Sequence, residues 1–365
     1  MNKQQLLVQL QSEGVQLLTA EGQTLGRRGG AGPSDHKAMT IDGTTVMVPV
    51  YTESASDSAI GLKIDGKSGT LLRNDAAIAN VELPQQPKFY ELTTADGIPY
   101  SHIALLHSRD VLATTLLQTC LRYDTPGQAC QFCAIGQSLA AGRTIARKSP
   151  EQLAEVAEAA VRLDGVKQLI MTTGTPNRTD RGAAYLARCA AAVKAQVPHL
   201  PIQAQCEPPD DFVWFQRMRD AGVDNLGMHL EAVEPRVRSQ VMPGKSEVPV
   251  SYYLEAFAAA VNVFGRGQVS TYLLAGLGDS FDALVSMCDR LIDLGVYPFL
   301  VPFVPLAGTP LAKQSPPKSE FMRTLYERIG TKLQSAELFA SDTKAGCAKC
   351  GACSALSAFE HKVSI

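Results

Sequence analysis

The chain has 365 residues, 45% of them hydrophobic, and a formal net charge of −2 at neutral pH. That length is too great for one small domain and suits a barrel with an extension. The near-neutral charge and the lack of a basic block exclude a typical nucleic-acid-binding protein. The sequence opens without an apolar signal core and contains no apolar run of about 20 residues, so we expect a cytoplasmic protein without a membrane span.

Residues 1–105 predict a small β-rich domain. An amphipathic helix is expected over residues 3–12, and the alternating runs at 44–51 and 60–64 are typical of strands. The D-G pair in IDGKSGTLL predicts a hairpin turn, and TTADGIPYSHIALL contains a second such pair. The glycine-rich segment RRGGAGPSDH (27–36) suits a cradle for an anionic group, a lid over a barrel, or a plain flexible loop.

From about residue 110, runs of strand length alternate with amphipathic helical segments. The six predicted strands span 111–118, 167–174, 200–206, 225–231, 269–278 and 298–305. One helix begins with SPEQ, where Ser149 is a suitable N-cap and Pro150 the first helical residue. This alternation predicts an α/β fold with a partial (βα)6 barrel of the TIM type over residues 106–330. In such a barrel, chemistry lies at the carboxyl ends of the strands.

Three cysteines follow the first predicted strand and so fall at that end of the barrel: Cys120, Cys130 and Cys133. Nine cysteines in a cytosolic type of chain indicate metal binding rather than disulfides. Three thiolates can hold three irons of a four-iron cluster and leave the fourth iron open. The alternative is a zinc site, in which Cys130 and Cys133 pair with Cys347 and Cys350.

The tail, residues 331–365, has a second cysteine motif, CAKCGAC, formed by Cys347, Cys350 and Cys353. This compact spacing is typical of an iron–sulfur cluster, and the small residues around it allow the chain to wrap tightly. The fourth ligand is open: Cys206, His361 or a substrate could supply it. The alternative is a tail whose cysteines bind nothing.

The barrel resembles the radical S-adenosylmethionine (SAM) superfamily, and within it the biotin-synthase-like branch. The resemblance starts from QACQFC, in which Phe132 stands where the family places a ring beside the adenine of SAM. The gap between the last two cysteines matches the family, whereas nine residues replace the usual three in the first gap. The resemblance implies that SAM chelates the open iron of a [4Fe-4S] cluster.

Four further motifs at predicted strand ends extend the resemblance. TTGT stands where a glycine motif receives the methionine ammonium of SAM, which implies a role for Thr173, Gly174 and Thr175. GMHLEA stands where polar residues bind the ribose, which implies His229 and Glu231, although His229 replaces a family asparagine. A carboxylate suits this role because both ribose hydroxyls are donors.

The third motif, LLAGLGDS, resembles the family's adenine-binding turn and implies contacts from Gly276, Leu277 and Gly278. Glycines there let the backbone approach a ligand closely, and Asp279 or Ser280 is expected to cap the next helix. The segment VPFVPLAGTPLA also resembles the end of the family's sixth strand.

The chain departs from biotin synthases at their second cluster, which three cysteines and an arginine hold inside the barrel. Only Cys206 falls at such a place here, while Thr172, Thr173 and Ser270 occupy the others. A biotin synthase is therefore not expected. Cys206 could face the barrel mouth or be an ordinary buried cysteine, and we favour the latter. We interpret the mid-helix cysteines Cys189 and Cys288 as core residues.

As a whole, the chain resembles a radical SAM family of unassigned chemistry found in bacterial gene clusters that also encode a nitrilase. The resemblance implies cleavage of SAM to a 5′-deoxyadenosyl radical, a small-molecule substrate, and an external electron donor such as flavodoxin or ferredoxin. After hydrogen abstraction we favour sulfur insertion from the auxiliary cluster, with oxidation or rearrangement using that cluster as electron acceptor as the alternative. A non-enzymatic zinc or iron–sulfur protein is the rival of another class.

Overall fold

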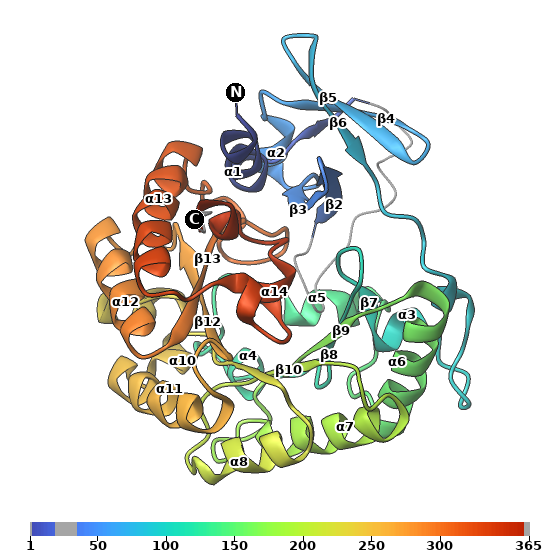
Figure 1. Ribbon diagram of the computed structural model, residues 1–365, viewed down its shortest axis with the longest axis vertical. Helices are drawn as coiled ribbons and strands as arrows, with labels where there is room; N and C mark the ends of the chain where they lie inside the picture. The colour runs from blue at the N-terminus through green and yellow to red at the C-terminus, as the bar shows by residue number, and fades with distance from the viewer. Residues whose placement is uncertain (1, 19–34, 361–365) are drawn as a thin grey trace.

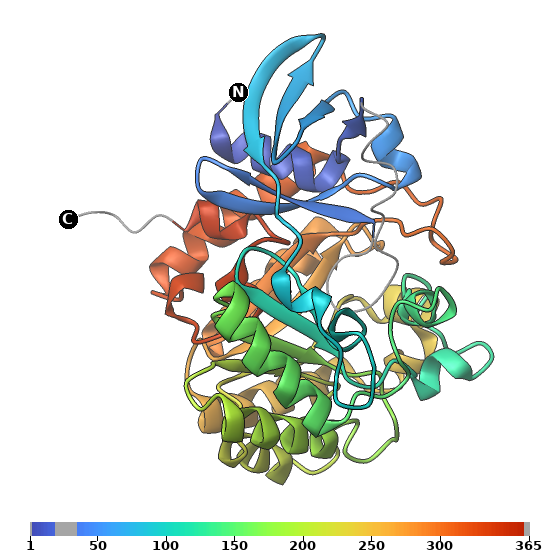
Figure 2. The same cartoon turned by 90° about the vertical axis from the view of Figure 1, so that its right-hand side faces the viewer.

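The computed structural model describes residues 2–18 and 35–360, so most of the 27–36 segment and His361 lie outside the described residues. Two sheets organise the chain. A six-stranded sheet is built from the N-terminal residues, and a seven-stranded sheet from residues 105–302. The N-terminal sheet stands on one side of the larger sheet in both views (Figures 1 and 2).

The N-terminal sheet has the strand order β1-β4-β5-β6-β2-β3 and is antiparallel except for the β1–β4 pair. Its strands are β1 (Gln16–Leu17), β2 (His36–Ile41), β3 (Thr44–Pro49), β4 (Gly61–Asp65), β5 (Ser68–Arg73) and β6 (Ala76–Glu82). The predicted turn in IDGKSGTLL joins β4 to β5 and is confirmed. The helix α1 (Lys3–Glu13) starts with a capping box made by Asn2 and Gln5 and packs on β3. A short helix, α2 (Glu53–Ser56), follows β3.

The second D-G pair was expected to resemble the first, but it does not join two strands. Only an isolated bridge between Thr93 and Pro99 flanks it, and the short helix α3 (Tyr100–Ile103) follows. Pro99 directly precedes this helix, and a proline there has φ fixed for a helical start and no N–H to pair in a strand. A 3-10 turn, η2 (Lys88–Glu91), comes before it.

The larger sheet runs in chain order from β7 to β13, and all pairs from β8 to β13 are parallel. Its strands are β7 (Leu105–Leu106), β8 (Val111–Thr115), β9 (Gln168–Thr172), β10 (Ile202–Gln205), β11 (Asn225–Gly227), β12 (Val269–Ala275) and β13 (Val296–Pro302). The sheet curls into a half-barrel with helices along its outer side (Figure 1). The α/β class is confirmed, and each of the six predicted strands overlaps one of the parallel strands.

A helix follows each parallel strand from β8 to β13 and buries one face. These helices are α6 (Pro150–Asp164), α7 (Ala183–Gln196), α8 (Val213–Asp220), α11 (Val250–Phe264), α12 (Phe281–Asp293) and α13 (Ser319–Ser335). The predicted start of α6 is confirmed, because Ser149 caps it and Pro150 is its first residue. Alternation along the strands puts Leu112, Leu169 and Ile202 against the helices, where they are fully buried. No helix in the described part of the chain is long and apolar enough to cross a membrane.

Shorter elements lie in the loops around the sheet. They are α4 (Leu121–Asp124), α5 (Ile135–Ala140), α9 (Pro235–Val241), α10 (Pro243–Ser246), η3 (Ala340–Asp342), α14 (Cys347–Cys350) and η4 (Leu356–Phe359). Three of these, η3, α14 and η4, belong to the tail. Strand β11 ends at Gly227, earlier than the predicted 231. Beyond it, Glu231 has a left-handed φ of 66°.

The tail returns to the inner face of the half-barrel, at the amino ends of its strands. Glutamine side chains hold its backbone there. Gln268 accepts from the Lys344 N–H at 2.9 Å, Gln168 from Gly346 at 2.6 Å, and Gln203 from Cys347 at 3.1 Å. These buried amides would be costly without partners, so the tail completes the inner face of the sheet.

Candidate active site

The loop carrying the first three cysteines crosses the carboxyl ends of β8 and β9. Cys120 directly precedes α4, and the next N–H, from Leu121, donates to the Thr175 carbonyl at 2.9 Å. A tight turn follows in which the Cys133 N–H donates to the Cys130 carbonyl at 3.0 Å. The N–H of Gln131 anchors this turn on Val241 at 2.7 Å.

The three thiols of this loop are close enough for their charges to interact. Burial raises the pKa of Cys133 to about 12, and the charge of Cys120 adds to that effect. Burial also raises the pKa of Cys130 well above its usual range, with further contributions from Glu231 and Cys133. Thiolates in this place therefore need a bound cation. A cationic iron–sulfur core would supply that charge. Cys120, Cys130 and Cys133, called the trio below, therefore fit the predicted cluster.

A zinc ion shared by the two cysteine motifs is not supported by their positions. Cys130 packs beside Phe132 on an apolar cluster around Val237 and Phe303. The tail cysteines Cys347 and Cys350 instead pack on β8 and β9. Within residues 2–18 and 35–360, no three His, Cys, Asp or Glu side chains converge as one metal ion would require.

The TTGT motif lies under the cysteine loop. A Cβ atom on Gly174 would lie 2.0 Å from the Thr119 carbonyl oxygen, so only glycine lets the cysteine loop pass. The hydroxyl of Thr173 donates to the Gly174 carbonyl at 2.8 Å. The hydroxyl of Thr175 donates to Glu207 at 2.6 Å. The motif is therefore built into the base of the loop, where the sequence placed it.

A buried ion pair beneath the loop was not predicted. Arg122 binds Glu207 with both ends of its guanidinium, at 2.8 and 2.9 Å, and also donates to the Gly244 carbonyl. Burial by itself raises the pKa of Glu207, but the hydrogen bond from Arg122 and nearby positive charges bring it below its usual value. The pair ties the first cysteine segment to the end of β10.

Glu231 also has a partner that the sequence did not reveal. Its carboxylate accepts from the Lys245 ammonium at 2.7 Å, and both side chains are largely buried. Burial alone lowers the pKa of Lys245, but the charge of Glu231 more than offsets this and raises it. The backbone of Glu231 bridges Leu273, which fixes the carboxylate beside the cysteine loop.

His229 lies next to Glu231 in the cavity wall. Its Nδ1 accepts a hydrogen bond from the Tyr272 N–H at 3.3 Å, and the two rings meet edge to face at 4.5 Å. Burial, helped by the charge of Lys245, lowers the pKa of His229 to about 3. The ring is therefore neutral at physiological pH and can offer one N–H to a ligand.

The glycine turn after β12 adopts a backbone that needs glycine. Gly276 and Gly278 have φ values of 105° and 124°. Between them, Leu277 packs in the same apolar cluster as Cys130 and Phe132. Ser280 caps α12, as predicted, whereas Asp279 accepts two N–H groups at the start of α9.

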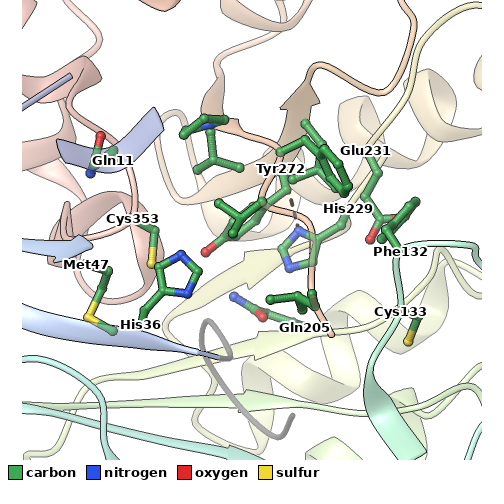
Figure 3. A pocket seen from close by; sticks show the side chains of 16 residues that line it. Gln11, His36, Met47, Phe132, Cys133, Gln205, His229, Glu231, Tyr272 and Cys353 are labelled. Carbon is green, nitrogen blue, oxygen red and sulfur yellow. Dashed lines mark hydrogen bonds between the residues drawn. The ribbon is translucent and has the colours of Figure 1, made fainter. Parts of the chain in front are cut away.

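A cavity of about 370 Å³ opens between these groups (Figure 3). One end is lined by the proposed cofactor residues Phe132, Cys133, His229 and Glu231. Its middle is apolar and includes Leu274 and the end of β13 with the loop that follows.

The far end of the cavity joins the tail to the N-terminal sheet. Cys353 lines it together with Gln11, His36 and Met47. The carbonyl of Ala352 accepts from the Met47 N–H at 2.7 Å and from Gln11 at 3.0 Å. Both cysteine groups therefore reach a single cavity that the N-terminal domain helps to enclose.

A family model described as the radical SAM superfamily matches residues 125–291. This segment is similar to the radical SAM superfamily, and the chain is an enzyme. The matched residues include Cys130 and Cys133, and they begin after Cys120. The family implies a [4Fe-4S] cluster and SAM, which agrees with the thiol trio and the charged pair described above.

Two curated relatives differ in how much of the chain they match. Bacteriochlorophyllide c C-7(1)-hydroxylase of Chlorobaculum limnaeum is 23% identical over 342 residues, 89% of this chain and 83% of that protein. Lipoyl synthase of Marinobacter nauticus is 27% identical over 174 residues, 46% of this chain and 47% of its own length. Among solved structures, the [FeFe]-hydrogenase maturase HydG aligns with a TM-score of 0.48 and 14% identity, over 61% of this chain and 49% of that one.

Each tail thiol lies near a polar side chain. Gln205 donates to the Cys347 sulfur at 3.1 Å. Ser108 lies 3.5 Å from the Cys350 sulfur, and His107 Nε2 lies 3.4 Å from that of Cys353. Such partners suit thiolate ligands, so the tail fits a second cluster.

The other cysteines lie apart from both groups. Cys189 and Cys288 are fully buried between helices and sheet, as predicted. Cys206 is 7% exposed in the same core, and burial raises its pKa to about 12. The Thr172 hydroxyl hydrogen-bonds to the Thr115 hydroxyl, and the Ser270 hydroxyl accepts a hydrogen bond from Gln203. The tail, rather than the strands, brings cysteines to the inner face of the barrel.

Proposed function

We propose that this radical SAM enzyme removes a hydrogen atom from a small, largely apolar substrate held between its two cysteine groups. The observation that carries this proposal is the single cavity lined by Cys133 at one end and Cys353 at the other. A volume of about 370 Å³ lies at the small end of the range for ligand sites. The apolar middle of the cavity favours a substrate with an uncharged body.

In this proposal Cys120, Cys130 and Cys133 hold the [4Fe-4S] cluster. When bound, the cluster and SAM together supply the 5′-deoxyadenosyl radical that takes hydrogen from an unactivated C–H bond, with an external donor such as flavodoxin or ferredoxin providing the electron. The protein contributes orientation and the exclusion of water.

We assign separate sets of residues to the methionine end and to the nucleoside end of SAM. Thr173, Gly174 and Thr175 receive the methionine ammonium, while Glu231 and the neutral His229 bind the ribose. One oxygen of Glu231 faces Lys245, which leaves the other for the ribose hydroxyls. An ammonium has three donors, so Lys245 can also bind the carboxylate of SAM. Phe132, Gly276, Leu277 and Gly278 enclose the adenine.

Cys347, Cys350 and Cys353 hold a second iron–sulfur cluster on the opposite wall. Two chemistries remain for its use. The lipoyl synthase likeness, over less than half of this chain, supports sulfur insertion. The likeness to a hydroxylase spans 89% of this chain and supports oxidation of the substrate radical followed by addition of water. The wider coverage leads us to place oxidation first and sulfur insertion second.

Anaerobic reconstitution tests the enzyme class directly. We expect a brown protein with about eight irons per chain, as for two four-iron clusters, that forms 5′-deoxyadenosine from SAM under reductant. A colourless zinc protein that does not cleave SAM would instead support the non-enzymatic alternative. Acid-labile sulfide measured before and after turnover then separates the chemistries, because sulfur insertion consumes sulfide and oxidation leaves it intact.

A further inference from the structure

Arg238, on helix α9, is a cation buried close to the Glu231–Lys245 pair. The residue is only 2% exposed. In the described part of the chain, the hydrogen bonds of its guanidinium go to four backbone carbonyls and none goes to a carboxylate. The guanidinium carbon lies over the Tyr253 ring, 5.4 Å from the ring centre. A buried charge is costly unless hydrogen bonds hold it, so the position of Arg238 depends on those four carbonyls.

One terminal nitrogen of Arg238 holds the turn that carries Glu231. Nη1 donates to the carbonyls of Leu230 at 2.8 Å and of Ala232 at 3.0 Å, which flank Glu231 in the chain. Glu231 itself has a φ of 66°, a left-handed conformation that residues other than glycine adopt at a cost. Its own N–H and carbonyl pair with β12. The turn is therefore held from two sides, by β12 and by Arg238, and this fixes the direction of the Glu231 carboxylate.

The other terminal nitrogen holds the segment that carries Lys245. Nη2 donates to the Val248 carbonyl at 3.0 Å and to the Lys245 carbonyl at 3.4 Å. The helix α10, which contains Lys245, has four residues, and so short a helix is not stable without contacts outside itself. One guanidinium therefore joins the two backbone segments whose side chains meet at 2.7 Å.

We propose that Arg238 is a positioning residue for SAM binding, which fixes the distance and direction of Glu231 and Lys245 before SAM arrives. The proposal rests on the proposed function, because it requires those two side chains to contact SAM. A site whose polar groups are fixed in advance loses less free energy to ordering when its ligand binds. Without the arginine, the left-handed turn and the short helix lose the group that joins them.

Lysine cannot replace arginine in this position. The two terminal nitrogens of a guanidinium are held in one rigid plane, and here each of them contacts a different segment. A lysine has a single nitrogen on a flexible chain, so it keeps the charge but cannot hold both segments in the same way. Arg238→Lys therefore removes the bridge and retains the charge.

The test uses the full chain, reconstituted anaerobically, with SAM itself as the probe. Iron per chain and the dissociation constant for SAM are measured for Arg238→Lys. We expect unchanged iron and SAM binding weakened about 10-fold, the factor for one lost hydrogen bond to a charged group. The control is Arg266→Lys, because Arg266 also joins two segments through their carbonyls, those of Ile292 and Ala336, but precedes β12 at its amino end. SAM affinity should not change in this control.

A second background shows whether Arg238 acts through the Glu231–Lys245 pair. Glu231→Gln combined with Lys245→Gln removes both charges together, so neither is left buried without its partner. Adding Arg238→Lys to this double variant should weaken SAM binding further by less than about twofold, because the two changes act on the same contacts and are not additive. A general loss of stability would instead reduce SAM affinity by the same factor in both backgrounds.

The outcomes separate this proposal from the proposed function. Unchanged SAM affinity in Arg238→Lys, with iron retained, overturns the role of Arg238. An equal loss in Arg266→Lys, or the same factor in both backgrounds, also overturns it, because the arginine would then act through overall stability. If Arg238→Lys does not retain its iron, Arg238→Gln, which keeps a planar N–H donor, is measured against the same criteria. Full SAM affinity in the Glu231→Gln/Lys245→Gln variant instead contradicts the proposed SAM site itself, and with it this role of Arg238.

Discussion

The two cysteine groups of this enzyme sit in different electrostatic surroundings. Charged side chains surround the trio: Lys245 pairs with Glu231, and Arg122 pairs with Glu207. The tail thiols instead meet Gln205, Ser108 and His107. The comparison agrees with the proposed function, in which the first site would bind a charged cosubstrate and the tail would only hold a cluster.

The difference follows from what each site must accept. SAM brings a sulfonium, an ammonium and a carboxylate, so its site needs charges of both signs fixed in advance. A buried charge without a partner is costly, which explains why each charge near the trio is already paired. The proposed tail site needs no such charges, and the polar side chains of Gln205 and Ser108 add none there.

The largest effect is expected from the trio itself. Replacing Cys130 or Cys133 by Ala removes a thiolate that no neighbour replaces, so about four irons per chain should be lost, together with all SAM cleavage. Iron analysis and 5′-deoxyadenosine formation measure both. Cys288→Ala, which alters a buried core cysteine, is the control that keeps its iron. Cys120 lies outside the family match, and normal cleavage by Cys120→Ala would show that another residue is the first ligand.

The tail should matter for half of the iron and little for SAM cleavage. Joint replacement of Cys347, Cys350 and Cys353 by Ser should remove about four irons and leave 5′-deoxyadenosine formation in place, because the trio is separate. Equal iron in the variant and the wild type would mean that the tail binds no cluster. In that case the tail would not be a second cluster site to compare with the trio.

A smaller effect is expected at Glu231. Hydrogen bonds to a charged group contribute about 1.5–3 kcal/mol each, so Glu231→Ala should weaken SAM binding by roughly 10- to 100-fold without loss of iron. Because the change also leaves Lys245 buried without its partner, Glu231→Gln is the better matched variant and should lose less affinity. Equilibrium binding of SAM to the reconstituted protein measures this loss of affinity. Full affinity in both variants would mean that Glu231 does not bind the ribose.

The smallest effect is a pH dependence from His229. An unfolded chain binds a proton at this residue below pH about 6.5, whereas burial keeps the folded residue neutral down to a pKa of about 3. The stability that the neutral ring contributes is therefore present above pH 6.5 and is lost as pH falls toward 3, by about 2 kcal/mol at pH 5. Urea unfolding at pH 7 and pH 5 should show this loss in the wild type and not in His229→Asn. Equal pH slopes for the two proteins would contradict it.

Much of the fold could be predicted because its signals are local. The apolar runs that became β8 to β13, and the caps such as Ser149, depend on neighbours in the sequence. The glycines of the turn after β12 could also be predicted to matter, because glycine adopts positive φ values at low cost. Gly276 and Gly278 do have positive φ values.

The partners that complete the site could not be found in the same way. Arg122 and Glu207, or Glu231 and Lys245, lie far apart in the sequence or across a loop, and a charge alone predicts an exposed residue. One signal was available: Gln203 and Gln205 recur with a period of two in a strand expected to be buried. Buried amides require partners, and that requirement indicated a further segment on the inner face.

The tail also imposes an order on assembly. Residues 340–360 are synthesised after the sheet that they fill, so the amides of Gln168, Gln203 and Gln268 must stay hydrated until the tail arrives. The interior of the nascent half-barrel is therefore hydrated, and docking of the tail displaces that water.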